Sequence, residues 1–106
     1  MLPKKNRVNK KEVDLLFKEG KFVSSPNFTF KFKITKLPVP QISVIVPKAV
    51  AKLAVKRNLL RRRGYSVLEK HLKQFPAGLL GVFVFKKYQE DVVIIENEIK
   101  NILNKV

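Results

Sequence analysis

The segment AVKRNLLRRR, residues 54–63, is the part of the chain best suited to bind a ligand, because five of its ten residues are basic and none is acidic. Guanidinium and ammonium groups form their strongest hydrogen bonds with phosphate and carboxylate oxygens. No Asp or Glu occurs between residues 22 and 68, so the neighbouring sequence offers no carboxylate to neutralise this charge. The segment therefore predicts a site for a polyanion.

Charge is distributed unevenly over the 106-residue chain, whose formal net charge is +15. Residues 1–75 hold 19 of the 23 basic residues and four of the eight acidic ones, whereas residues 76–106 hold four of each. A basic region confined in this way is typical of a nucleic-acid-binding protein. Two alternatives are a basic surface that only maintains solubility and an anionic membrane as partner, which the lack of a strongly amphipathic basic helix with Trp anchors disfavours.

The sequence lacks the residue clusters of an enzyme active site. Cysteine is absent, His71 is the single histidine, and no glycine-rich phosphate loop or zinc-ligand spacing occurs. We interpret the acidic residues of the C-terminal third, Glu90, Asp91, Glu96 and Glu98, as a solvated helix face. We therefore predict no catalytic residue and no metal ligand in this chain.

The apolar segments are too short to cross a membrane. The longest is residues 78–85, well below the roughly 18 residues of a spanning helix. The first residues contain no hydrophobic block of signal-peptide length, and the absence of cysteine suits a reducing compartment. We expect a cytoplasmic protein that does not bind membranes.

Periodicity predicts one α+β domain over residues 1–106, with a basic N-terminal arm over residues 1–8. The first helix is capped by Asn9 and ended by Gly20. Strict alternation predicts a half-buried strand over residues 28–34, and the run 79–85, apolar on both faces, predicts a central strand. The expected order is helix 9–19, short strand 21–24, strand 28–34, strand 41–46, basic helix 48–73, strand 79–85 and a helix from Asp91.

A helical projection of residues 50–68 predicts where the basic side chains point. One sector, expected to face the sheet, holds the apolar residues Val50, Leu53, Leu60, Val67 and Leu68. Arg57 and Arg61 fall at the edge of this sector, where they would reach into a groove between helix and sheet. Buried guanidinium groups need a counter-charge, so we interpret this groove as an anion site; the alternative is that a kink at Gly64 lets both arginines reach water.

The aromatic residues have two possible roles. Phe28 and Phe30, with Phe17 of the first helix, are candidates for stacking on unpaired bases, and the alternative is that the phenylalanine row forms core. Lys31 and Lys33 alternate with this row and are expected on the opposite, polar face.

The residues in this order resemble the protein component of bacterial ribonuclease P. RVNKKEVDLLFKEGK (residues 7–21) is similar to the opening of that family, and FTFKFKI and ISVIVPK are similar to its following strands. AVKRNLLRRR is similar to the family signature, an Arg-Asn-Arg core followed by further basic residues. Leu59 replaces the last arginine of that core, and Tyr65 stands where another basic residue is common.

The resemblance implies a single αβββαβα domain with a mixed four-stranded sheet packed with helices and a left-handed crossover. It implies binding of the catalytic RNA and of the 5′ leader of precursor tRNA, with endonucleolytic removal of the leader performed by the RNA and Mg²⁺. No cofactor in the protein itself and no protein partner are implied. The alternative is a ribosomal or other structural RNA-binding protein.

Together, the charge pattern and the resemblance predict one set of RNA-binding residues. Those of the signature, Arg57, Asn58, Arg61 and Arg62, are implied to contact the catalytic RNA or to order its metal environment. The full set is Lys4, Lys5, Arg7, Lys31, Lys33, Lys48, Lys52, Lys56, Arg57, Asn58, Arg61, Arg62 and Arg63.

Overall fold

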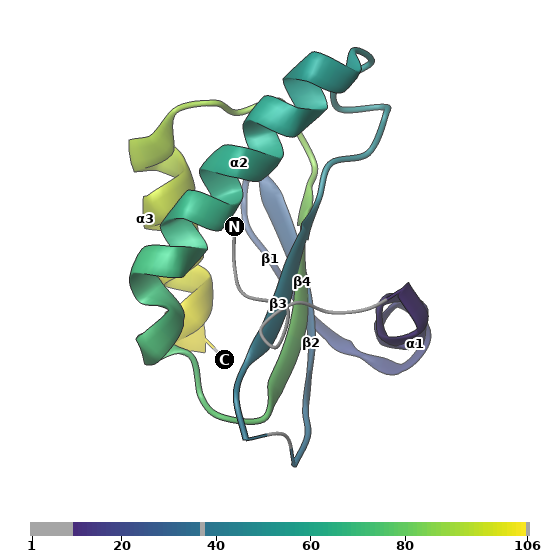
Figure 1. Cartoon of the computed structure of the whole chain (residues 1–106), viewed down its shortest axis with the longest axis vertical. Helices are drawn as coiled ribbons and strands as arrows, with labels where there is room; N and C mark the ends of the chain where they lie inside the picture. Colours follow the sequence, from purple (N-terminus) through teal and green to yellow (C-terminus); the bar gives the residue numbers. More distant parts are fainter. Residues whose placement is uncertain (1–9, 37, 106) are drawn as a thin grey trace.

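The computed structural model of the chain describes residues 10–36 and 38–105, and the helices and strands follow the predicted order (Figure 1). Gly20 ends the first helix with a hydrogen bond from its N–H to the Leu16 carbonyl at 2.9 Å, whereas the predicted cap Asn9 lies outside the described residues. The elements are α1 (Lys10–Glu19), β1 (Lys21–Ser24), β2 (Phe28–Ile34), β3 (Gln41–Ile45), α2 (Ala54–His71), the 3-10 helix η2 (Leu72–Gln74), β4 (Leu79–Phe85) and α3 (Val92–Lys105).

The strands form one mixed sheet in the order β1-β2-β4-β3. β2 is antiparallel to β1 and to β4, while β3 runs parallel to β4. The predicted central place of β4 is confirmed, as is the predicted mixed four-stranded α+β fold. α2 lies in the connection between the parallel strands β3 and β4, and the left-handed sense of this crossover stays a prediction.

Helices cover both faces of the sheet: α2 and α3 lie on one side and α1 on the other (Figure 1). The larger core cluster joins Phe83 of β4 to Leu60 of α2 and Ile99 of α3. The smaller cluster joins Leu16 of α1 to Leu80 and Val82 of β4. Successive side chains of a strand point to opposite faces, so β4 needs apolar residues throughout to supply both clusters.

Helix α2 begins at Ala54, six residues later than predicted. Residues 48–50 form a turn instead, in which the Pro47 carbonyl accepts the N–H groups of Val50 at 3.0 Å and Ala51 at 3.3 Å. This turn breaks the helical phase, so the prediction that Leu53 faces the sheet is wrong and its side chain is 67% exposed. The sheet-facing residues of α2 are Leu60, Gly64, Tyr65, Val67 and Leu68.

The phenylalanine row of β2 is core at its first two positions. Phe28 and Phe30 are fully buried, and the rings of Phe30 and Phe83 stack with their centroids 4.2 Å apart. A ring with no exposed surface cannot stack on a base, so the stacking prediction is wrong for these two residues. Gly81 makes room for this arrangement, because a Cβ there would lie 2.4 Å from the Phe30 ring.

Helix α3 begins next to Asp91 as predicted, and the Asp91 carboxylate accepts the N–H of Val93 at 2.9 Å. Its apolar stripe of Ile95, Ile99 and Ile102 is buried. No helix in residues 10–36 and 38–105 is long and apolar enough to cross a membrane.

Glu98 contradicts the prediction that the acidic residues of α3 form a solvated face, because it is buried. Its carboxylate accepts hydrogen bonds from Ser25 Oγ at 2.6 Å, Asn27 N at 2.8 Å and Asn27 Nδ2 at 2.6 Å. The donors belong to the turn between β1 and β2, so Glu98 fixes that turn to α3.

Candidate nucleic-acid interface

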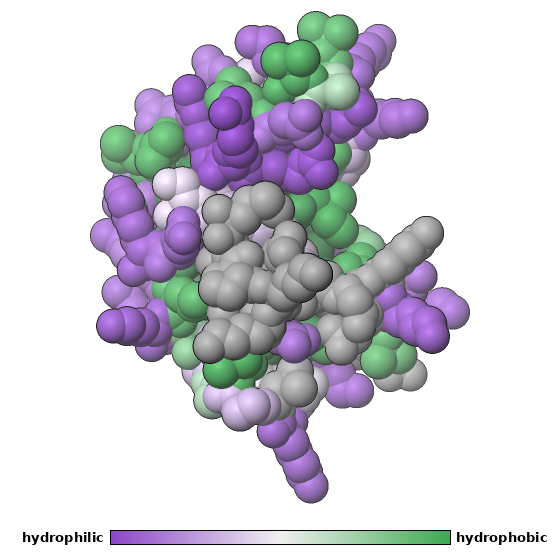
Figure 2. Space-filling view, in the orientation of Figure 1, coloured by the Kyte–Doolittle hydropathy of each residue, from purple (hydrophilic) through white to green (hydrophobic). Residues whose placement is uncertain are grey.

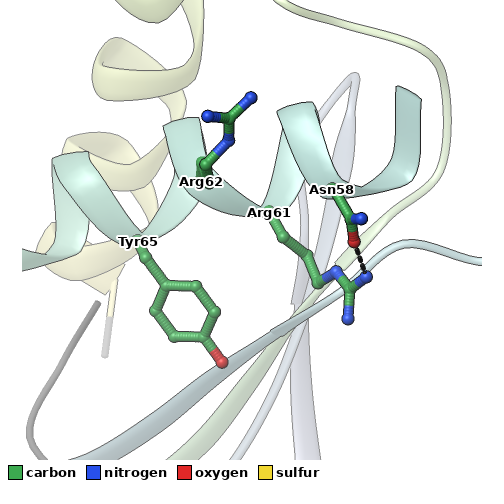
Figure 3. A pocket seen from close by; sticks show the side chains of 4 residues that line it. All are labelled: Asn58, Arg61, Arg62 and Tyr65. Atoms are coloured by element: carbon green, nitrogen blue, oxygen red, sulfur yellow. Dashed lines mark hydrogen bonds between the residues drawn. The ribbon is translucent and has the colours of Figure 1, made fainter. Parts of the chain in front are cut away.

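A cavity of about 330 Å³ lies along α2 and is lined by Asn58, Arg61, Arg62 and Tyr65 (Figure 3). Helical spacing brings these side chains together, since residues three or four positions apart lie on one side of a helix. Arg61 Nη2 donates a hydrogen bond to Asn58 Oδ1, the residue one turn earlier (Figure 3). The structure thus joins three of the four predicted signature residues at one site.

Tyr65 closes the cavity on the side of the sheet. Its ring is buried, it points from α2 toward β3 (Figure 3), and its hydroxyl accepts the N–H of Val44 at 3.2 Å. A basic residue at this position would put a charge against the sheet, whereas tyrosine anchors α2 to β3. Apart from the departure from the family signature, no sequence pattern indicates this role.

Arg57, the fourth signature residue, does not line the cavity. Its Nη1 donates to the carbonyls of Ala51 at 3.0 Å and Lys52 at 2.8 Å. The half-buried side chain therefore folds back and holds the loop that precedes α2. The predicted placement of Arg57 in the same groove as Arg61 is wrong, because the carbonyls of the loop at Ala51 and Lys52 draw its side chain away from the cavity that Arg61 lines.

Arg63 points to the other side of α2 and donates to the Glu90 carbonyl of the β4–α3 connection. Next to it, Tyr88 donates its hydroxyl proton to Glu90 Oε2 at 2.8 Å. This hydrogen bond raises the pKa of Tyr88. Arg63, a predicted RNA-binding residue, thus joins α2 to the β4–α3 connection.

The remaining predicted lysines lie on two surfaces. Lys48, Lys52 and Lys56 are exposed around the start of α2. Lys31 lies on the α1 side of the sheet, where its Nζ is 4.4 Å from the ring centroid of Phe17, which is 44% exposed. The stacking prediction for Phe17 stays open, and Lys4, Lys5 and Arg7 lie outside the described residues.

A second cavity, of about 370 Å³, lies at the outer strands of the sheet. It is lined by Lys21, Phe32, Lys33 and Ile34. Lys33 therefore lies at a cavity, its RNA-binding role stays a prediction, and Lys21 is a second basic residue of the lining. The pairing of Lys21 with Phe32 across β1 and β2 brings it there.

Among the side chains that the structure describes, Arg57, Arg61 and Arg62 of α2 have no carboxylate partner. The ion pairs of this part of the chain join Glu96 to His71 at 3.2 Å and to Lys100 at 4.0 Å; none reaches Arg57, Arg61 or Arg62. Figure 2 shows hydrophilic side chains gathered over α2. The side chains of Arg61 and Arg62 point in different directions from α2 (Figure 3). Guanidinium groups form strong hydrogen bonds with phosphate oxygens.

Comparison with known proteins agrees with this geometry. The family model described as Ribonuclease P matches residues 2–106. The ribonuclease P protein component of Borrelia duttonii (strain Ly) is 31% identical over 106 residues, which cover 97% of this chain and 91% of that protein. The corresponding protein of Borrelia recurrentis (strain A1) matches equally well.

Solved structures show the same fold. The RNase P protein from Thermotoga maritima superposes with a TM-score of 0.85 at 20% identity, covering 94% of this chain and 96% of that one. The RNase P protein of Staphylococcus aureus superposes with a TM-score of 0.81 at 17% identity, covering 94% of each chain. With the family match along almost the whole sequence, the chain belongs to the ribonuclease P protein family and is the protein subunit of that tRNA-processing ribonucleoprotein endonuclease.

Proposed function

We propose that this subunit binds the catalytic RNA of ribonuclease P through α2 and the 5′ leader of precursor tRNA through the sheet, and so assists removal of the leader. The observation that carries the proposal is the cavity lined by Arg61 and Arg62, neither of which has a carboxylate partner among the described side chains. RNA phosphates supply the missing negative charge.

Two separate surfaces support two RNA contacts. The guanidinium groups of Arg61 and Arg62 project from a rigid helix that Tyr65 ties to β3, which suits a folded RNA of fixed shape. The sheet offers Lys31 beside the half-exposed ring of Phe17. A lysine next to an exposed aromatic ring is the combination that binds single strands, since the ring stacks on a base while the ammonium group contacts the backbone.

The hydrolytic step is assigned to the RNA and its Mg²⁺ ions. Within the described residues, no three His, Cys, Asp or Glu side chains lie together as a metal site. The protein side chains would bind and orient RNA and neutralise its charge. We also propose a cytoplasmic location, because the proposed substrate is transcribed there.

Substrate affinity over a series of leader lengths tests the leader contact. The holoenzyme should bind precursor tRNA with a leader of several nucleotides more tightly than precursor tRNA with a one-nucleotide leader. The affinity for the longer leader should also fall more steeply with salt, by about 0.7 in the log–log slope for each extra single-strand phosphate contacted. Equal affinities and equal slopes across the series would show that the protein does not bind the leader.

A further inference from the structure

The first turn of α2 exposes two aliphatic side chains that the fold does not use. Leu53 is 67% exposed and Val55 is 75% exposed, although both lie in the most basic part of the chain. Figure 1 shows this turn at one end of the longest axis of the molecule, and Figure 2 shows hydrophobic surface there between hydrophilic side chains. Single exposed apolar residues are common on protein surfaces, so a role for these two depends on what surrounds them.

The surroundings of this apolar pair indicate what it contacts. The lysines next to it in sequence, Lys52 and Lys56, are exposed, as is Lys48 in the preceding turn, and the first turn of α2 holds no acidic residue. Lysines at this density repel a second copy of this chain and attract a polyanion. The charge complementarity therefore favours RNA as the occupant.

The structure also holds this end of α2 in place. Arg57 Nη1 binds the carbonyls of Ala51 and Lys52, and the Leu53 carbonyl accepts the N–H of Arg57 at 3.1 Å as the first helical hydrogen bond. These hydrogen bonds hold the loop before α2 in one conformation, so less conformational entropy is lost when Leu53 and Val55 bind a partner.

We propose that Leu53 and Val55 form an apolar contact with the catalytic RNA, packing on ribose or base faces while the neighbouring lysines bind phosphates. This inference rests on the proposed function and adds a contact that does not depend on charge. A convex, projecting end cannot enclose a single-stranded leader, but it fits the wide, shallow minor groove or an unstacked base of a folded RNA.

Salt titration of binding to the catalytic RNA separates this contact from the electrostatic ones. Leu53→Ser and Val55→Ser should each weaken binding by roughly 5- to 10-fold, because they remove apolar surface from the interface. They should leave the slope of log affinity against log salt unchanged, since no counterion release is lost. Lys52→Ala should instead lower the slope by about one.

The matched control is Val93→Ser, since Val93 is 66% exposed on α3, in the neutral third of the chain. It should bind RNA like wild type, and thermal unfolding should show all four variants folded. The inference is overturned if Leu53→Ser and Val55→Ser bind the RNA like wild type, or if they reduce only self-association or binding to anionic phosphatidylserine vesicles. If wild type itself fails to bind the catalytic RNA, the proposed function fails with it, so the two failures are distinguishable.

Discussion

Replacing Arg61 with alanine should weaken binding of the catalytic RNA without weakening the fold. Arg61 is exposed, and the partner that the structure gives its side chain is the neighbouring Asn58. Surface changes of this kind alter stability by less than about 0.5 kcal/mol. One lost charge-assisted hydrogen bond to a phosphate costs about 1.5–3 kcal/mol, which is roughly a 10- to 150-fold loss of affinity.

The assay is equilibrium binding of the protein to the catalytic RNA at fixed salt. Lys105→Ala is the matched control, because Lys105 is an exposed residue of α3 in the neutral third of the chain. It removes the same charge and should change affinity by no more than about twofold. Equal losses for Arg61→Ala and Lys105→Ala would refute the reasoning, because they would mean that total charge, and not the cavity, determines binding.

Further expectations concern the leader contact, the fold and its pH dependence. Lys31→Ala and Lys33→Ala should each flatten the dependence of substrate affinity on leader length and leave binding of the catalytic RNA nearly unchanged. Glu98→Ala should lower the free energy of unfolding by about 3 kcal/mol in a urea titration, because three donors lose a buried acceptor. The hydrogen bond with His71 lowers the pKa of Glu96 from its ordinary value of 4.5, so this contact stabilises the fold above that pH and is lost as the pH falls through the lowered pKa. Glu96→Gln should therefore be less stable than wild type at pH 7, and the difference should shrink as the pH falls below 4.5, as measured by urea unfolding.

Each of these expectations has a contrary outcome. An unchanged leader-length dependence in both lysine variants would move the leader away from the α1 side of the sheet. Glu69→Ala, a change at an exposed residue of α2, is the control for the stability measurement. If Glu98→Ala lowers the free energy of unfolding as little as Glu69→Ala does, Glu98 does not fix the β1–β2 turn to α3. If the difference in stability between Glu96→Gln and wild type does not shrink at acidic pH, the effect comes from packing and not from the charge of Glu96.

The sheet was predictable because its strands carry unambiguous patterns. The strand β4 is apolar at every position, and only a strand covered on both faces needs that composition. The stripe of Ile95, Ile99 and Ile102 likewise fits one helix face. Both patterns can be read from the sequence because a buried face requires apolar residues at the spacing of the strand or helix that carries it.

The start of α2 was not predictable from periodicity, because Pro47 favours a helix start as well as the turn that the structure contains. The hydrogen bonds from Val50 and Ala51 to the Pro47 carbonyl form a local turn, and this turn shifts the phase of everything before Ala54. The misplacement of Leu53 follows from that shift, whereas Arg57 lies within α2 and is misplaced because its guanidinium turns back to the carbonyls of Ala51 and Lys52.

The candidate site was predictable in its chemistry and only partly in its geometry. Charge density identified α2, and the helical spacing of Asn58, Arg61 and Arg62 brings them to one side. The anchoring of Tyr65 to Val44 and the burial of Glu98 depend on partners 21 and more than 70 residues away. Contacts at such separations leave no periodic trace in one sequence.

Reconstitution tests the central claim most directly: the protein is mixed with the catalytic RNA of ribonuclease P and precursor tRNA at low Mg²⁺, and 5′ processing is measured. We expect processing under these conditions to require both the protein and the catalytic RNA, and we expect no cleavage by rigorously RNA-free protein. Processing by the protein alone, or RNA-catalysed processing that the protein leaves unchanged, would contradict it.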